Sequence, residues 1–378
     1  MAAYDVIVVG TGGVGSAALM HLAERGARVL GLDRFEGGHD RGSSHGQTRI
    51  IRQAYFEHPD YVPLLRRAYE LWAKLEHEHE EPLLHQAGLL QVGPPDGTVI
   101  PGVLESARRH GIAVERFTAC EAAKRFPGFH VPDRYEAVFE PTAGYLLVEQ
   151  CVLAHLSQAR RWGAEIRSDV TVHSLATSSD EVAVLTDGGT IVAPRVVVTA
   201  GAWSQELLGK MPIRLRVLRK HLHWLANDDA RYRRDGGCPT FLYELPEGTF
   251  YGFPQFDEWG VKAAMHSGGE EIDDPLTVDR GVDAAEFEQV RSFIAAHLPG
   301  VSNRATHHAT CLYTMSPDEN FLVDKHPQNS HVVLAAGLSG HGFKFTSVLG
   351  EALADLALEG RTDLPIGFLG LNRFDDGA

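Results

Sequence analysis

The fold is decided by Asp5-Val6-Ile7-Val8-Val9-Gly10-Thr11-Gly12-Gly13-Val14-Gly15. The aliphatic run that fills residues 5–9 predicts a buried β-strand. Residues 16–25 then predict a helix, and Gly26 lies where a helix C-terminus favours glycine. Residues 28–32 predict a second strand. Strand, glycine turn, helix and strand in this order indicate an α/β domain with a parallel sheet.

The glycine turn predicts a dinucleotide site. Gly10, Gly12 and Gly15 satisfy G-x-G-x-x-G between a strand and a helix. Glycines let the backbone approach a pyrophosphate, and the helix N-terminus offers free N–H groups. Asp33 ends the second predicted strand, where a carboxylate can bind ribose hydroxyls and repel a 2′-phosphate. The turn alone does not separate FAD from NAD, but the charged loop and β-rich segment that follow favour FAD.

Composition limits the classes of function. A chain of 378 residues is long enough for two domains or for one domain with a large insertion. Thirty-five Lys and Arg against fifty Asp and Glu give a net charge of −15, which disfavours nucleic acids and anionic membranes. The first apolar run ends at Gly10, so neither a signal peptide nor a transmembrane helix is expected there. Four cysteines without a metal or disulfide spacing fit a reducing cytoplasm.

Further along the chain, the pattern of apolar residues predicts more of the same sheet. Residues 61–76 predict an amphipathic helix packed on the first unit. Residues 170–172, 182–185 and 196–198 predict strands, and the last runs into Thr199-Ala200-Gly201. Residues 332–337 repeat that form, which is typical of buried parallel strands whose carboxyl ends meet a ligand. Residues 216–317 are more aromatic and less regular, which indicates an inserted sheet domain.

Four further segments carry a resemblance to a known family. They are Gly42-Ser43-Ser44-His45-Gly46-Gln47-Thr48-Arg49-Ile50-Ile51-Arg52; Tyr251-Gly252-Phe253-Pro254 with Lys262 after it; Cys311-Leu312-Tyr313-Thr314; and Gly337-Leu338-Ser339-Gly340-His341-Gly342-Phe343-Lys344-Phe345. In these segments the chain resembles the monomeric sarcosine oxidase and N-methyltryptophan oxidase family of flavoproteins, in the D-amino-acid oxidase superfamily. The segments occur in the family's order, so the resemblance covers essentially the whole chain.

The resemblance implies roles for the residues that match. Cys311 matches the cysteine that binds FAD covalently, although an ordinary buried cysteine is the commonest alternative. Arg52 and Lys344 match two cations that hold the substrate carboxylate, one of them able to bind it in bidentate fashion. Tyr251, His266 and Tyr313 match the lining of the substrate pocket, although aromatic residues and histidines often serve packing alone.

Other matches concern the cofactor. His45 and Arg49 match residues against the flavin ring, and Lys262 matches the lysine near flavin N5 that promotes reaction with oxygen, with a solvated lysine as the alternative. The resemblance also implies further cofactor contacts from Ser44, Thr48, Val170, Gly201, Gly340, Gly342 and Phe343.

The resemblance and the residues together predict the architecture. We expect an α/β fold in which a Rossmann-like FAD domain (residues 1–85, 145–215 and 318–378) carries an inserted antiparallel-sheet substrate domain (86–144 and 216–317). No metal is assigned: residues 76–81 alternate Glu and His on a predicted helix end, and His307-His308 lacks a second ligand pair.

The expected function is that of a cytoplasmic, monomeric oxidase with covalent FAD. Its substrates would be dioxygen and a small secondary amino acid, first sarcosine and second N-methyl-L-tryptophan or another N-alkyl or cyclic amino acid. Gln47 and Leu242 differ from the acid and the methionine of relatives, so the shape of the pocket can differ. A flavin dehydrogenase with another acceptor, or a non-catalytic flavin-binding protein, would share the glycine motif.

Overall fold

A parallel sheet forms the core of the first part of the molecule. The computed structural model describes residues 3–209, 211 and 213–377. Its six-stranded sheet is parallel except for the antiparallel edge pair β20·β21, and has the order β20 (Leu322–His326), β21 (Asn329–Ala336), β13 (Arg195–Val198), β1 (Val6–Val9), β2 (Val29–Leu32) and β9 (Glu165–Arg167). The predicted Rossmann-like α/β fold is therefore confirmed.

Two layers cover this sheet, which explains why β1 is apolar throughout. Val6 and Val8 belong to the core shared with the helices, namely α1 (Gly13–Glu24), α2 (Val62–His79), α5 (Val148–Arg161) and α8 (Thr346–Leu358). Ile7 and Val9 face the other side, which is covered by α6 (Ser204–Leu208) and the antiparallel sheet β10 (Val172–Thr177), β11 (Val182–Thr186) and β12 (Gly189–Ala193). A strand buried on both faces reads as a continuous apolar run.

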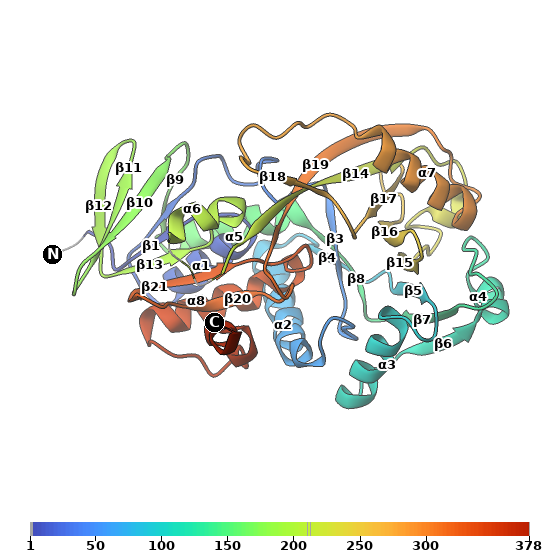
Figure 1. Cartoon of the computed structure of the whole chain (residues 1–378), viewed down its shortest axis with the longest axis horizontal. Helices are drawn as coiled ribbons and strands as arrows, with labels where there is room; N and C mark the ends of the chain where they lie inside the picture. Colours follow the sequence, from blue (N-terminus) through green and yellow to red (C-terminus); the bar gives the residue numbers. More distant parts are fainter. Residues whose placement is uncertain (1–2, 210, 212, 378) are drawn as a thin grey trace.

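A second, larger sheet forms the other part of the molecule. Figure 1 shows it beside the first part along the longest axis, with β14 and β19 extended between the two. Its strands are β18 (Glu270–Ile272), β14 (Arg216–Leu225), β17 (Val261–Met265), β16 (Gly248–Phe253), β15 (Thr240–Leu245), β5 (Leu89–Gly93), β7 (Glu136–Glu140) and β6 (Glu115–Thr118) in this order, with β19 (Ala305–Met315) also paired to β14. All neighbours are antiparallel except β5 and β15, which come from distant segments of the chain.

The two faces of the large sheet have different partners. One face packs against α4 (Ala119–Arg125) and α7 (Ala284–His297) around Phe241, Phe250 and Phe293. The opposite face presents the side chains of Tyr251 and Cys311 and packs against α3 (Val99–His110). This face points toward the first part of the molecule. A separate, small sheet consists of β3 (Thr48–Ile51), β8 (Gly144–Leu147) and β4 (Leu84–His85) in this order. The short 3-10 turns are η1 (Pro59–Tyr61), η2 (Gly201–Trp203), η3 (Ala230–Tyr232), η4 (Phe343–Phe345), η5 (Gly367–Leu369) and η6 (Leu371–Gly377).

Two local predictions differ from the structure. The strand predicted at residues 170–172 begins only at Val172, because Asp169 takes a left-handed turn with φ 58° and the Val170 N–H donates to the Asp33 carbonyl at 2.9 Å. Helix α7 lies inside the segment that we expected to be irregular. Asp283 caps it, accepting hydrogen bonds from the N–H groups of Ala285 and Glu286 at 2.8 and 3.0 Å.

Candidate active site

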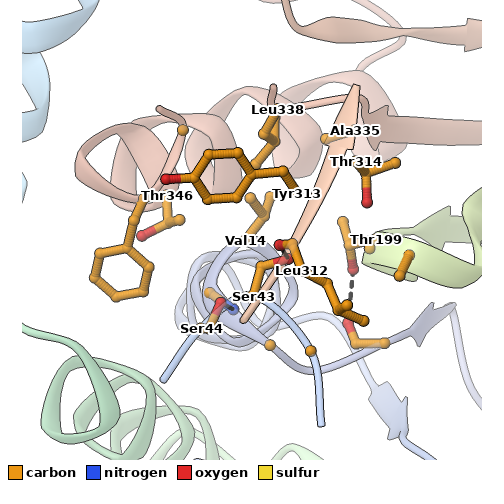
Figure 2. Close-up of a pocket in the computed structure, with 18 of the residues that line it drawn as sticks. Val14, Ser43, Ser44, Thr199, Leu312, Tyr313, Thr314, Ala335, Leu338 and Thr346 are labelled. Atoms are coloured by element: carbon orange, nitrogen blue, oxygen red, sulfur yellow. Dashed lines mark hydrogen bonds between the residues drawn. The ribbon is translucent and has the colours of Figure 1, made fainter. Parts of the chain in front are cut away.

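The glycine turn between β1 and α1 is built so closely that it leaves no room for a side chain at Gly10 or Gly15. Gly10 has φ +88°, and a Cβ there would lie 2.6 Å from the Thr199 carbonyl oxygen. At Gly15 a Cβ would lie 1.8 Å from the Gly10 carbonyl oxygen. The Thr199 hydroxyl donates to that same oxygen at 2.6 Å (Figure 2). The start of α1 is thereby pressed onto the end of β1, which leaves its N-terminus open to a ligand.

Ser44 and Asp33 complete this end of the site. The Gly13 N–H donates to the Ser44 hydroxyl at 3.1 Å, and Ser44 lies beside Ser43 at the pocket wall (Figure 2). Asp33 accepts from the Thr11 N–H at 2.6 Å, from the Thr11 hydroxyl at 3.1 Å and from the Phe35 N–H at 3.0 Å. The Asp33 carboxylate thus holds the glycine turn in place and also lines the cavity.

A single large cavity runs from this turn into the space between the two parts. The empty space at this site, including solvent at its mouth, is about 1760 Å³. The carboxyl ends of β1, β13 and β21 line it, as predicted from their small terminal residues. Figure 2 shows Val14, Thr199, Leu312, Tyr313, Ala335 and Leu338 around it. Of the expected cofactor residues, it is lined by Gly10, Gly12, Asp33, Ser44, Val170, Gly201, Gly340, Gly342 and Phe343.

The two cations expected to hold a carboxylate lie in the wall of this cavity. Arg52 and Lys344 both line it and are 3% and 4% exposed. Arg52 pairs with Glu57 at 2.5 Å, whereas the Lys344 ammonium donates to the His341 carbonyl at 2.7 Å. Burial, and next the charge of Arg52, lower the pKa of Lys344 to about 7. The pair therefore keeps one permanent charge and one charge that titrates near neutrality.

Uncharged hydrogen-bonding groups stand near these cations. Tyr251, His266 and Tyr313 line the cavity, and His266 Nδ1 lies 3.3 Å from the Tyr313 hydroxyl. Burial lowers the pKa of His266 to about 3, so its imidazole is neutral at pH 7. Burial also raises the pKa of both tyrosines, which stay protonated. Leu242 adds an apolar side chain to the wall of the cavity.

Arg49 reaches the cavity and links two other predicted residues. Its guanidinium donates to the Ser43 carbonyl at 2.9 Å, to Cys311 Sγ at 3.1 Å and to the Thr48 carbonyl at 2.9 Å. Cys311 is fully buried, and its neighbour Leu312 lines the cavity. The thiol thus lies against a cation, next to the cavity wall.

Lys262 lies behind this wall. Its ammonium donates to the Gly46 carbonyl at 2.5 Å, the Thr48 carbonyl at 2.9 Å and the Thr48 hydroxyl at 3.1 Å. It also lies over the rings of Phe253 and Trp224, at 4.8 and 5.3 Å from their centroids. Burial, and next Arg49, hold the pKa of Lys262 well below its usual range. All three donors of the ammonium are used within the protein.

Several predicted residues contribute to the site without lining the cavity. Lys262, Thr48, His45, Gly15 and Cys311 belong to this group. Burial, and next Arg49, lower the pKa of His45 to about 3. Sequence reasoning missed Glu57 entirely, because it lies in an irregular loop where spacing gives no signal. Burial favours the neutral acid, but Arg52, His341 and Lys344 outweigh it and bring the pKa of Glu57 to about 2.

Neither a metal centre nor a membrane span is found in the part of the chain that the structure describes. Within residues 3–209, 211 and 213–377, no group of three His, Cys, Asp or Glu is arranged to hold a metal. His308 does contact another histidine that is distant in the sequence: its Nε2 lies 2.9 Å from Nδ1 of His221. In the same ranges no helix has the length and apolar character needed to cross a membrane.

Comparison with known proteins identifies the family of this chain. Residues 5–356 match the FAD dependent oxidoreductase family. The chain belongs to this family. The oxidoreductase is 40% identical over 375 residues to monomeric sarcosine oxidase of Bacillus sp. (strain B-0618), covering 98% of this chain and 96% of that protein.

Two further proteins are similar to this FAD-dependent oxidoreductase. N-methyl-L-tryptophan oxidase of Yersinia pestis (strain Pestoides F) is 38% identical over 373 residues, covering 98% of this chain and 99% of that protein. The solved structure of NikD in its open form, an amino acid oxidase of nikkomycin biosynthesis, has a TM-score of 0.85 at 28% identity, covering 98% of both chains. The family confirms the expected FAD dependence, and the glycine turn, whose Cβ positions are blocked, fits the pyrophosphate of that cofactor.

Proposed function

We propose that this oxidoreductase oxidises the C–N bond of a small N-methyl amino acid such as sarcosine. The N-methyl amine, dioxygen and water would give the primary amine, an aldehyde and hydrogen peroxide. The observation that carries the proposal is the buried pair Arg52 and Lys344 at the end of a cavity that begins at the glycine turn. The resemblance to sarcosine and N-methyl-L-tryptophan oxidases supports the same substrate class.

FAD supplies the redox chemistry when bound, since it accepts two electrons from the amine and passes them to dioxygen. The N-terminus of α1 and Ser44 would hold its phosphates, and Asp33 would hold a ribose. We propose covalent attachment through Cys311, supported by the buried thiol and the Arg49 guanidinium 3.1 Å from it.

The residues of the chain bind and orient the substrate. Arg52 and Lys344 would hold the carboxylate, so that the amine lies toward Tyr251 and His266. The imidazole of His266 would stay neutral, because burial lowers its pKa to about 3, and it could orient the substrate amine by hydrogen bonding. Lys262 would place a positive charge near the oxygen-reacting side of the site.

The chain also divides between two domains in this proposal. We propose that residues 1–85, 145–215 and 318–378 form the FAD domain and residues 86–144 and 216–317 the substrate domain. The parallel sheet takes all its strands from the first set, and the large sheet takes all its strands from the second. We further propose a monomer in the cytoplasm, in keeping with four free cysteines, three of them buried.

The test is a peroxide assay of the purified yellow protein across N-methylated and cyclic amino acids. We expect sarcosine to give the highest kcat/KM, with N-methyl-L-tryptophan slower. A higher value for N-methyl-L-tryptophan or a cyclic amino acid would reassign the substrate. Anaerobic bleaching by substrate without return of colour in air would identify a dehydrogenase.

A further inference from the structure

Tyr55 contacts both cations of the carboxylate site. It lies in the loop between β3 and η1 and is fully buried. The Arg52 guanidinium carbon lies over its ring, 4.6 Å from the centroid. The Lys344 ammonium lies over the same ring, 5.2 Å from the centroid. A desolvated cation over an aromatic ring is attracted by its quadrupole, so this one ring stabilises two like charges.

The ring of Tyr55 is itself fixed by hydrogen bonds. Its hydroxyl lies 2.5 Å from Nδ1 of His341, and Nε2 of His341 lies 3.0 Å from the Glu319 carbonyl oxygen. Because a carbonyl only accepts, Nε2 carries the proton and Nδ1 accepts from the Tyr55 hydroxyl. The same His341 accepts from Lys344 through its carbonyl at 2.7 Å. Tyr55 therefore connects the Arg52 loop to the turn that presents Lys344.

We infer that Tyr55 is a positioning residue, whose ring holds the two cations at the spacing that a substrate carboxylate needs. The inference rests on the proposed function, in which Arg52 and Lys344 bind that carboxylate. Glu57 forms its ion pair with Arg52 at 2.5 Å, whereas the ring of Tyr55 lies against both cations, 4.6 Å from Arg52 and 5.2 Å from Lys344. Loss of the ring should weaken the binding of an acid and leave the binding of a neutral ligand almost unchanged.

The chain offers a matched control in Tyr61. It is also fully buried and packs against Tyr55 at 5.2 Å between ring centroids. Its hydroxyl donates to Asn320 at 3.2 Å. Among residues 3–209, 211 and 213–377, no Lys or Arg lies over the Tyr61 ring. Replacing Tyr61 by Leu removes a similar ring from the same cluster without removing a cation contact.

The experiment measures ligand binding by calorimetry on holoenzyme, with propionate as the acid and propionamide as its neutral isostere. We expect Tyr55→Leu to weaken propionate at least tenfold, equivalent to about 1.4 kcal/mol, and propionamide less than threefold. Tyr55→Phe keeps the ring and should bind propionate within threefold of wild type, as should Tyr61→Leu. If Tyr55→Leu does not fold, Tyr55→Met takes its place.

The outcomes separate the inference from the proposed function. Unchanged propionate affinity in Tyr55→Leu, equal losses for both ligands, or an equal loss in Tyr61→Leu would overturn the positioning role. Lys344→Met tests the carboxylate site itself. If Lys344→Met binds propionate as tightly as wild type, the proposed site fails; if it binds weakly while Tyr55→Leu does not, only the role of Tyr55 fails.

Discussion

Lys344 and Arg52 differ in how firmly each keeps its charge. Arg52 is paired with Glu57, and a guanidinium stays protonated at any accessible pH. Lys344 donates only to a carbonyl within the protein, and burial with the charge of Arg52 lowers its pKa to about 7. The strength of the proposed carboxylate site should therefore depend on pH.

The first prediction follows from the sign of this shift. Lys344 is charged below its pKa and loses its proton as the pH rises through about 7. Carboxylate affinity should thus be highest at pH 6 and fall roughly tenfold by pH 8.5, the loss of one charge-assisted hydrogen bond. Calorimetric titration of propionate over this range measures it, and Lys344→Met should abolish the dependence. Constant affinity in wild type would contradict the assignment.

Lys262 carries the prediction about oxygen. Its three hydrogen bonds end on Gly46 and Thr48, so the substitution Lys262→Met removes a buried amino group and these three bonds behind the cavity wall. Anaerobic bleaching by substrate should survive, while the return of colour in air should slow at least about a hundredfold, or some 2.7 kcal/mol. Stopped-flow spectroscopy separates the two rates. Wild-type reoxidation in the variant would mean that another group activates oxygen.

Cys311 carries the prediction about covalent attachment. The thiol is fully buried beside Arg49 and next to the cavity-lining Leu312. After acid denaturation and electrophoresis, yellow fluorescence should remain with the wild-type polypeptide and leave Cys311→Ser. Release of all fluorescence from wild type would show that FAD is held without a covalent bond.

At the scale of elements, the contact between β1 and α1 depends on Gly15. A Cβ at Gly15 would lie 1.8 Å from the Gly10 carbonyl oxygen, whereas a Cβ at Gly367 would meet nothing within 4 Å. Gly15→Ala should therefore push the helix from the strand, lower the FAD content of purified protein below about a tenth of wild type and reduce its melting temperature by several degrees. Gly367→Ala is the control. Full FAD content in Gly15→Ala would contradict this view of the turn.

Elements with a strong local signal could be predicted from sequence, and elements set by distant contacts could not. The run Val6–Val9 and the glycines after it are sufficient for β1 and α1. The start of β10 could not be predicted, because the Val170 N–H is held by the carbonyl of Asp33, the residue that follows β2. The parallel pairing of β5 with β15 joins segments about 150 residues apart, which no periodicity encodes.

The same limit applies to the candidate site. Resemblance supplied Arg52, Lys344, Tyr251 and His266, and the structure brings all four to one cavity. Resemblance gave no information on the partners of these residues. Glu57, which pairs with Arg52, and the shared ring of Tyr55 follow from the path of an irregular loop.

At the scale of the whole molecule, the cavity joins two sheets with separate tasks. The parallel sheet presents the glycine turn and the carboxyl ends of its strands, and the large sheet contributes Leu242, Tyr251 and Tyr313. Parts of the segments 42–52 and 337–344 complete the wall between them. In the proposed function, this division would let one part hold the cofactor while the other shapes the substrate pocket.

The central claim is that this cavity selects a secondary amino acid by its carboxylate. The most direct measurement compares the anaerobic bleaching of the yellow protein by sarcosine and by sarcosine methyl ester in a stopped-flow spectrometer. The ester lacks the negative charge that Arg52 and Lys344 would bind. We therefore predict that the second-order rate constant for bleaching by the ester is at least roughly 30-fold lower than the constant for sarcosine. Equal constants for acid and ester would contradict the claim.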